Sequence, residues 1–222
     1  MAPTPHRMTG VALITGAASG IGRATAHTFV SEGCTRLIIC DVNASGLKVV
    51  AEELKNLDAD VQTCLVIANV AVEEDVNRMI EEGVKAFGAI HYAVNNAGVS
   101  SKPRVRTDQL EVKSFDDVMA VNLRGVWLCE RAELRQMLKQ EKTLTMRTGA
   151  PAQRGAIVNI SSIFGKISHS NVGGYAAAKT GVLGISRTDA VAYGKDGIRV
   201  NSASFITGEE LVVDGGSIIA SH

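Results

Sequence analysis

The chain has 222 residues, of which 45% are hydrophobic and 21% are charged, as expected for one globular domain with a sizeable core. The 23 Lys and Arg residues balance the 23 Asp and Glu residues, which argues against a nucleic-acid surface or a strongly anionic partner. The four cysteines show neither metal-ligand nor redox spacing, and no segment carries about 18 uninterrupted apolar residues. We therefore expect one cytoplasmic domain over residues 1–222, with no metal, nucleic-acid or membrane partner.

Short β-rich runs alternate with helical patterns along the chain. The expected strands are Val11–Thr15, Leu37–Asp41, Val61–Val66, Ile90–Val94, Ala156–Ile160 and Ile198–Asn201, with Leu211–Val213 as a candidate seventh. The expected helices are Ile21–Ser31, Leu47–Leu57, Glu73–Phe87, Phe115–Lys139 and Tyr175–Tyr193. Continuous apolar strands that alternate with helices predict an α/β fold, in which helices cover both faces of a parallel sheet. The polar stretch Glu141–Gly155 is expected to be a surface insertion.

A glycine-rich turn joins the first expected strand to the first helix, and it contains Gly16, Ser19, Gly20, Ile21 and Gly22. Glycines let the backbone turn tightly and approach a pyrophosphate closely. The N-terminus of the helix then offers free N–H groups and the positive end of its dipole. The spacing G-x-x-x-G-x-G differs from the usual G-x-G-x-x-G dinucleotide fingerprint. The alternative is a turn that only connects a strand to a helix.

Asp41 ends the second expected strand, nineteen residues after Gly22. A carboxylate at this point can accept hydrogen bonds from the adenosine ribose hydroxyls, and it would repel a 2′-phosphate. The loop has Ser19 before Gly20 and no Arg or Lys ahead of it. The sequence therefore favours NAD over NADP as the cofactor. The alternative is that Asp41 is a turn residue or a helix cap.

Tyr175 and Lys179 stand four residues apart in an expected helix, which places them on one face, and Ser162 lies thirteen residues before Tyr175. A free tyrosine has a pKa of about 10, and a nearby cation favours the phenolate. The Tyr–Lys pair thus predicts a general acid or base, with a serine hydroxyl that could share the same substrate oxygen. Taken alone, the spacing could equally be a coincidence.

Together with further motifs, these residues resemble the classical short-chain dehydrogenase/reductase family over Val11–Asn201 and again over 203–216. The matching motifs are Thr15–Gly22, Asn95–Gly98, Asn122, Ile160–Ser162, Tyr175–Lys179 and Ile198–Asn201. The resemblance implies a Rossmann-like, doubly wound parallel sheet that binds a dinucleotide at the carboxyl ends of its strands.

The resemblance also implies a role for each matching side chain. Tyr175 would exchange a proton with the substrate oxygen, Lys179 would bind the nicotinamide ribose, and Ser162 would polarise the carbonyl. Asn122 would hold a water that links Lys179 to solvent. The remaining implied cofactor residues are Asn69, Val70, Asn96, Ala97 and Gly98.

Three of these positions have a simpler reading. Ser162 could be a strand-end hydroxyl bonded to nearby backbone, and Asn122 a helix residue that bonds to backbone across a kink. Asn69 stands where the family commonly has Asp, and it could instead cap the following helix.

The resemblance breaks after the sixth expected strand. Between Ser202 and Ala203 the family has a Pro-Gly turn, a substrate lid and a helix, and this sequence has no counterpart of any of them. The nine residues between Asn201 and Leu211 could span ~30 Å when extended, but would leave no helix over that part of the sheet. The segment is truly absent, the gene model is wrong, or the sequence omits residues. A true absence should weaken cofactor orientation and remove most of the substrate specificity.

The sequence therefore predicts an NAD(H)-dependent oxidoreductase that interconverts a secondary alcohol and a ketone by hydride transfer. The first alternative is a catalytically impaired dinucleotide-binding protein that lacks a complete substrate pocket, and the second is a fragment that does not fold alone. The substrate itself is not readable from the sequence. By resemblance, the helices Phe115–Lys139 and Tyr175–Tyr193 would pair between copies, giving a homodimer or a higher homo-oligomer.

Overall fold

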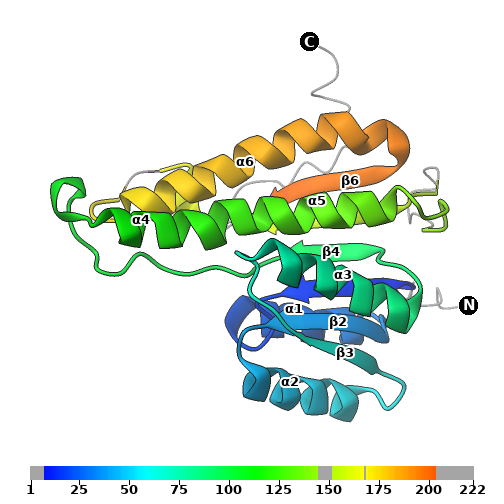
Figure 1. The fold of residues 1–222 in the computed structure, drawn as a ribbon. Helices are drawn as coiled ribbons and strands as arrows, with labels where there is room; N and C mark the ends of the chain where they lie inside the picture. Colours follow the sequence, from blue (N-terminus) through cyan, green and yellow to red (C-terminus); the bar gives the residue numbers. More distant parts are fainter. Residues whose placement is uncertain (1–7, 145–151, 168, 204–222) are drawn as a thin grey trace, which may run out of the picture.

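The protein is described here by a computed structural model, which covers residues 8–144, 152–167 and 169–203. Within these ranges, six strands form one parallel sheet with the order β3-β2-β1-β4-β5-β6 (Figure 1). The strands are β1 (Val11–Thr15), β2 (Arg36–Asp41), β3 (Gln62–Ile67), β4 (Tyr92–Asn95), β5 (Gly155–Ile160) and β6 (Ile198–Ala203). The chain crosses from one half of the sheet to the other between β3 and β4, so a crevice for ligands is expected at the carboxyl ends of β1 and β4.

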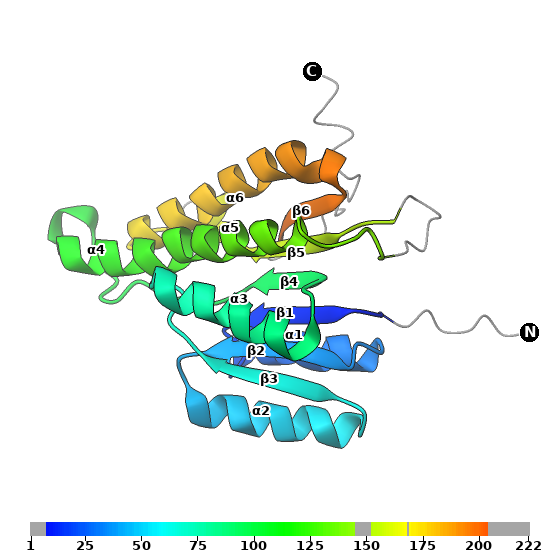
Figure 2. The same cartoon turned by 45° about the vertical axis from the view of Figure 1, so that its right-hand side comes forward.

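The helices cover both faces of this sheet, as the sequence predicts. They are α1 (Gly20–Ser31), α2 (Ala44–Leu57), α3 (Glu73–Phe87), α4 (Val112–Met119), α5 (Val126–Met137) and α6 (Gly173–Tyr193). Apolar side chains of α1 and α2 form one core layer, and those of α3 and α5 form the other. Figure 2 shows α2 beside β3 at one edge of the sheet and α6 beside β6 at the other. None of these helices combines the length and the apolar character needed to cross a membrane.

Strand β5 is covered unequally on its two faces. Ile157 is fully buried in the core layer of α3 and α5, whereas Ala156 and Val158 are only half-buried. Ile160 lies on the same side as these two residues and contacts the layer of α1 and α2. The sequence leads us to expect thin cover on this part of the sheet, since the family's helix before the seventh strand is missing. The candidate seventh strand, Leu211–Val213, lies outside the described residues.

The long helical stretch expected over Phe115–Lys139 is not α-helical throughout. A π-helix over Ala120–Gly125 joins α4 to α5, so the expected long helical stretch is confirmed, and its middle turns are π-helical rather than α-helical. Gly125 packs so closely that an added Cβ would lie 3.0 Å from Val70 Cγ2 and 3.2 Å from Ala120 O. Such π-helical turns often occur at functional sites, and this one contains Asn122.

Candidate active site

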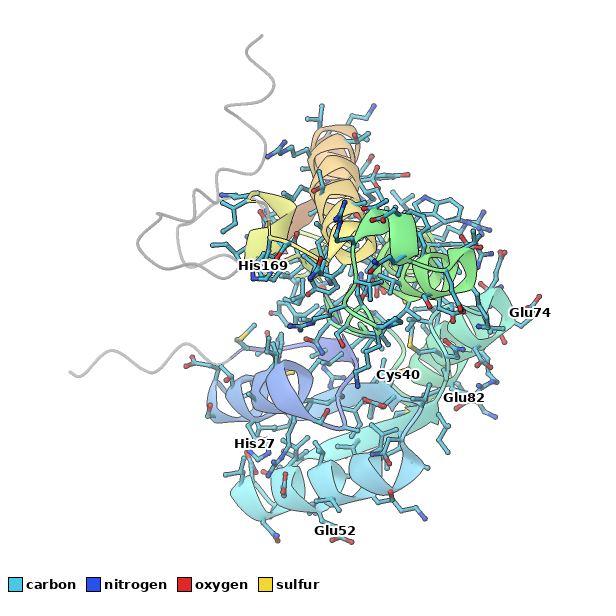
Figure 3. The ribbon with its side chains drawn as sticks, turned by 90° about the vertical axis from the view of Figure 1, so that its left-hand side faces the viewer. His27, Cys40, Glu52, Glu74, Glu82 and His169 are labelled. Carbon is cyan, nitrogen blue, oxygen red and sulfur yellow. The ribbon has the colours of Figure 1, made fainter. Side chains whose placement is uncertain are left out.

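A cavity of about 570 Å³ brings together the four side chains expected to be catalytic, Ser162, Tyr175, Lys179 and Asn122. The rest of its lining consists of Ile21, Asn96, Gly98, Val99, Ser100, Ser101, Arg104, Ile160, Ser161, Phe164 and Val172. Strand arrowheads point left in Figure 1, so Figure 3, seen from that side, looks onto the carboxyl ends of the strands. Among the described residues, no group of His, Cys, Asp and Glu side chains is arranged to hold a metal ion.

Lys179 and Tyr175 lie one helical turn apart on α6. The ammonium nitrogen of Lys179 is 5.8 Å from the centre of the Tyr175 ring, and it donates a 2.7 Å hydrogen bond to the carbonyl of Ile160. Lys179 is only 3% exposed, and this burial lowers its pKa to about 8. Because its pKa lies close to neutrality, the amine can release and regain a proton, which a proton relay requires.

The two serines after β5 use their hydroxyl groups differently. Ser161 Oγ donates to the backbone carbonyl of Lys179 at 2.8 Å, so its proton is engaged in holding α6. Ser162 Oγ accepts a 3.2 Å hydrogen bond from the Phe164 N–H, which is the local backbone bond of the simpler reading. Its own proton has no acceptor within the described ranges, and it can be donated to a substrate oxygen.

Phe164 also restrains Tyr175 from the side. The two rings meet edge to face, with centroids 6.5 Å apart, a favoured geometry for aromatic pairs. His169, labelled in Figure 3, packs on the same Phe164 ring at 5.2 Å. The phenol is therefore held by its aromatic neighbour as well as by its own helix.

Asn122 binds the backbone opposite α6. Its Oδ1 accepts from the Val99 N–H at 2.9 Å, and its Nδ2 donates to the Val99 carbonyl at 2.8 Å. An added Cβ on Gly98 would lie 2.7 Å from Asn122 Oδ1 and 3.7 Å from Lys179 Nζ. The simpler reading of Asn122, a bond to backbone across a kink, matches this geometry, and it leaves the relay role open.

The glycine-rich loop is tied to the end of β4 by Asn96 and Thr15. The Asn96 side chain donates to the carbonyls of Thr15 (3.1 Å) and Gly16 (3.2 Å). In return, Thr15 Oγ1 accepts from the N–H groups of Asn96 and Ala97, both at 3.1 Å. Sequence reasoning included Thr15 in the motif but gave it no role, since a β4 contact is visible only in the fold.

The backbone of the loop folds back on itself so closely that Gly22 has no space for a side chain. An added Cβ on Gly22 would lie 2.1 Å from Gly16 O, while Gly20 has a φ of +53° and open space around it. Ser19 is the N-cap of α1 and makes no side-chain cap hydrogen bond, and Ile21 is exposed beside it. The loop therefore fits a dinucleotide pyrophosphate at the free N–H groups of α1.

Replacing Gly22 by Ala should displace this loop. We expect Gly22→Ala to cost about 1–3 kcal/mol of stability through overpacking, and to weaken NADH binding at least about tenfold as the N–H groups move. Urea unfolding and calorimetry with NADH measure the two effects. The matched control is Gly184→Ala in α6, where an added Cβ meets nothing within 4 Å and Ala should stabilise the helix by roughly 0.5–1 kcal/mol. Unchanged NADH affinity in Gly22→Ala would contradict the phosphate role.

Asp41 supports the same loop from β2. Its Oδ2 accepts from the Ala18 N–H and its Oδ1 from the Asn43 N–H, both at 3.0 Å. The alternative that Asp41 is a turn residue is therefore confirmed. The alternative that Asp41 caps a helix is wrong, because the N-cap of α2 is Asn43, whose side chain accepts from the Gly46 N–H. A carboxylate has about four acceptor positions, so Asp41 keeps capacity for ribose hydroxyls.

Asn69 and Val70 follow β3 and do not line the cavity. The alternative that Asn69 caps α3 is wrong, because Val72 is the N-cap. Asn69 Oδ1 instead accepts from the Ala71 N–H at 3.0 Å, and the Asn69 N–H donates to Asp75 Oδ2 at 2.8 Å. This short turn leaves Asn69 exposed at the sheet edge where the adenine would lie.

Ser101 and Arg104 line the cavity but were missed by sequence reasoning. Both belong to the loop after Gly98. The sequence could have pointed to this loop only through the rule that ligands bind beyond the carboxyl ends of parallel strands. That rule does not indicate which residues of the loop face the ligand.

A family model described as short chain dehydrogenase matches residues 10–205. Levodione reductase of Leifsonia aquatica is 36% identical over 200 residues, which are 90% of this chain and 70% of that relative. The cis-4-hydroxycyclohexanecarboxylate dehydrogenase of Sinomonas cyclohexanicum is 37% identical over 194 residues, which are 87% of this chain and 71% of the relative.

Solved structures share the fold as well as the sequence. The crystal structure of levodione reductase superposes with a TM-score of 0.77 at 36% identity, over 86% of this chain and 69% of that one. A 3-ketoacyl-(acyl-carrier-protein) reductase from Brucella melitensis, in complex with NADH, gives 0.74 at 29% identity, over 86% and 72%. Since the family model spans nearly the whole described part and relatives exceed 30% identity, this chain belongs to the short-chain dehydrogenase family.

Proposed function

We propose that the protein is an NAD(H)-dependent oxidoreductase that interconverts a secondary alcohol and a ketone. The observation that carries this proposal is the meeting of Tyr175, Lys179 and Ser162 in one cavity, which Ile21 of the glycine-rich turn also lines. Two of the relatives are named for action on cyclic alcohols, cyclohexanol and cis-4-hydroxycyclohexanecarboxylate. Their names support a secondary alcohol as the substrate class.

Each side chain has a task in this proposal. The nicotinamide, when bound, supplies or accepts the hydride. Ser162 donates a hydrogen bond from its hydroxyl to the substrate oxygen and keeps its proton, while Tyr175 transfers the one proton to or from that oxygen. Lys179, with a pKa of about 8, restores the proton on Tyr175. Asn122 keeps the loop at Val99 in place beside them.

The rival proposal is a dinucleotide-binding protein without turnover. It is favoured by the absence, between Ser202 and Ala203, of a counterpart to the family's substrate lid, and by the half-buried positions of β5. Calorimetry with NADH, followed by a screen of secondary alcohols, separates the two. Turnover supports the oxidoreductase, and binding without turnover supports the rival. The absence of both binding and a cooperative melt would identify a fragment that does not fold alone.

The preference for NAD is tested at Asp41. We expect NADPH to bind at least about tenfold more weakly than NADH, because the Asp41 carboxylate would repel the 2′-phosphate. Asp41→Asn removes the charge and keeps one acceptor oxygen, so the ratio of the two dissociation constants should fall roughly tenfold. Asp58→Asn is the control, since Asp58 Oδ1 accepts from the Asp60 N–H at 2.9 Å in a similar turn away from the loop. An unchanged ratio in Asp41→Asn would overturn the assignment.

We also propose a homodimer formed through α4, α5 and α6. An apolar groove crosses these helices, lined by Asp116, Met119, Ala120, Leu123, Arg124, Trp127, Gly181 and Ile185. Light scattering at micromolar concentration should give a dimer or larger species. Trp127→Glu should shift it to monomer, because it places a charge in the apolar contact. Leu138→Glu, on an exposed residue outside the groove, should not, and a monomeric wild type would contradict the proposal.

A further inference from the structure

The cavity is positively charged. Its lining contains two cationic side chains, Lys179 and Arg104, and no Asp or Glu. The Lys179 ammonium group already donates a hydrogen bond to the Ile160 carbonyl. Arg104 lies on the loop that follows Gly98, and the described part of the chain offers it neither an ion pair nor a hydrogen bond. Its neighbour Arg106 does pair with a carboxylate, Asp108, at 3.3 Å. Arg104 is therefore a guanidinium available to a ligand.

Ser101 gives a second and independent sign of a ligand on the same loop. The side chain is 5% exposed and lines the cavity. Its hydroxyl has no hydrogen-bond partner in the structure as described. Buried hydroxyl groups are nearly always paired, because leaving one unpaired costs its full desolvation energy. A bound group that accepts or donates at this point would remove that cost.

The start of α6 adds a third favourable feature. Val172, at the N-cap of this 21-residue helix, lines the cavity and supplies no side-chain cap. Free N–H groups and a positive dipole end favour an anion there. The loop reaches this point, since an added Cβ on Gly173 would lie 3.7 Å from Thr107 Oγ1. The loop that carries Arg104 and Ser101 thus lies beside the first turn of α6, which contains Tyr175.

The phosphates of the cofactor do not account for these groups. In the proposed function, the pyrophosphate lies at the glycine loop, and Asp41 serves the adenosine ribose. Neither Asp41 nor Gly16 lines the cavity that contains Arg104, although the cofactor residues Ile21, Asn96 and Gly98 reach its edge. An anion bound by Arg104 is therefore assigned to the substrate in this inference, and NADH binding by an Arg104 variant tests that assignment.

We propose that the substrate is a secondary alcohol or ketone that carries a carboxylate group. The Arg104 guanidinium and the Ser101 hydroxyl bind the carboxylate, while the reacting carbon faces Ser162 and Tyr175. Arginine suits this task because its planar fork binds a carboxylate with two parallel hydrogen bonds. The inference rests on the proposed oxidoreductase function and adds the charge of its substrate.

The kinetic test compares 4-hydroxycyclohexanecarboxylate with its uncharged methyl ester. For the acid, Arg104→Gln should raise KM roughly 10- to 100-fold, the range of a lost charge-assisted hydrogen bond, with kcat changed only a few-fold. Ser101→Ala should raise KM for the acid several-fold. The ester should be unaffected by either change. Arg106→Gln is the control and should behave as wild type. Equal KM values for acid and ester in the wild type, or equal effects of Arg104→Gln on both, would overturn the inference.

A binding measurement separates this inference from the proposed function. With NADH present, cyclohexanecarboxylate should bind the wild type and lose its affinity in Arg104→Gln, and NADH affinity should stay the same. Such binding without turnover of any alcohol would support the carboxylate site and count against the oxidoreductase. Turnover of the ester without carboxylate binding would keep the oxidoreductase and overturn the site. Weaker NADH binding in Arg104→Gln would assign Arg104 to the cofactor and likewise overturn it.

Discussion

Tyr175→Phe is expected to lower kcat by about 10²- to 10⁴-fold, the usual contribution of a positioned general acid or base. The change removes one hydroxyl group and leaves the ring in its edge-to-face contact with Phe164. Lys179 keeps its hydrogen bond to the Ile160 carbonyl, so the positions of these two cavity-lining residues should not change. NADH affinity, measured by calorimetry, should stay within a few-fold of the wild type.

Tyr193→Phe is the matched control for this experiment. It removes the same atom from the same helix, at the end of α6 and outside the cavity. Its kcat and its melting temperature should equal those of the wild type. If Tyr175→Phe kept full turnover on a confirmed substrate, Tyr175 would not be the acid or base. If it lost NADH affinity as strongly as turnover, its role would be in binding.

The fold was predictable because its signals are local. Helix α3 begins at Glu73 and ends at Phe87, with the bounds expected from the sequence, and Gly88 follows as its stop. Gly88 has a φ of +80°, which glycine adopts without steric cost. The strands were likewise marked by apolar runs between turn residues, and all six within the described ranges formed.

The features that the sequence did not predict depend on contacts between distant segments. The π-helix around Asn122 fits a side chain that binds the backbone of Val99, 23 residues away, and a glycine packed on Val70. No helical propensity encodes either contact. The alternative of a cap at Asn69 fails for a similar reason, because the Asn69 side chain forms a turn with Ala71 instead.

The site was predictable where a motif fixes both residue type and spacing. Tyr175, Lys179 and the glycine loop are of this kind. Ser101 and Arg104 are ordinary loop residues by sequence, and only the fold shows that one is buried without a partner and that the other faces the same cavity. Glu130 and Glu133 are a more extreme case, because two charged residues in a helix normally indicate its exposed face.

Glu130 and Glu133 of α5 are fully buried against the sheet. Asn95 Nδ2 donates to Glu133 Oε2 at 2.9 Å, and Asn159 Nδ2 donates to Glu130 Oε2 at 3.0 Å. The two asparagines are neighbours on β4 and β5 and hydrogen bond to each other. Desolvation by burial raises the pKa of both glutamates to about 8. For Glu130, the nearby Asp189 and Glu133 raise the pKa further.

The stability of the protein should therefore fall as the pH rises from about 5 to about 9. A carboxyl group with a raised folded-state pKa binds more protons when folded than when unfolded, so its contribution is complete below the unfolded-state pKa and is lost as the pH passes the folded-state value. The unfolding free energy should decrease by about 3 kcal/mol or more over this range. The double variant Glu130→Gln/Glu133→Gln has no ionisable group at these two positions. Its unfolding free energy should therefore decrease much less between pH 5 and pH 9.

Urea unfolding at pH 5, 7 and 9 measures this difference between the variant and the wild type. The comparison removes contributions common to both proteins, such as that of His91, whose pKa is lowered by burial. Glu52→Gln/Glu81→Gln, which changes two exposed residues, should follow the wild-type curve; Glu52 is labelled on the helix surface in Figure 3. Parallel curves for the wild type and the buried double variant would mean that both glutamates are ionised when folded. If the unfolding free energies of the wild type and the buried double variant are similar at pH 5 and differ at pH 9, both glutamates are protonated in the folded protein. Two protonated acids then hold β4 and β5, the strands that lead into Asn96 and Ser162.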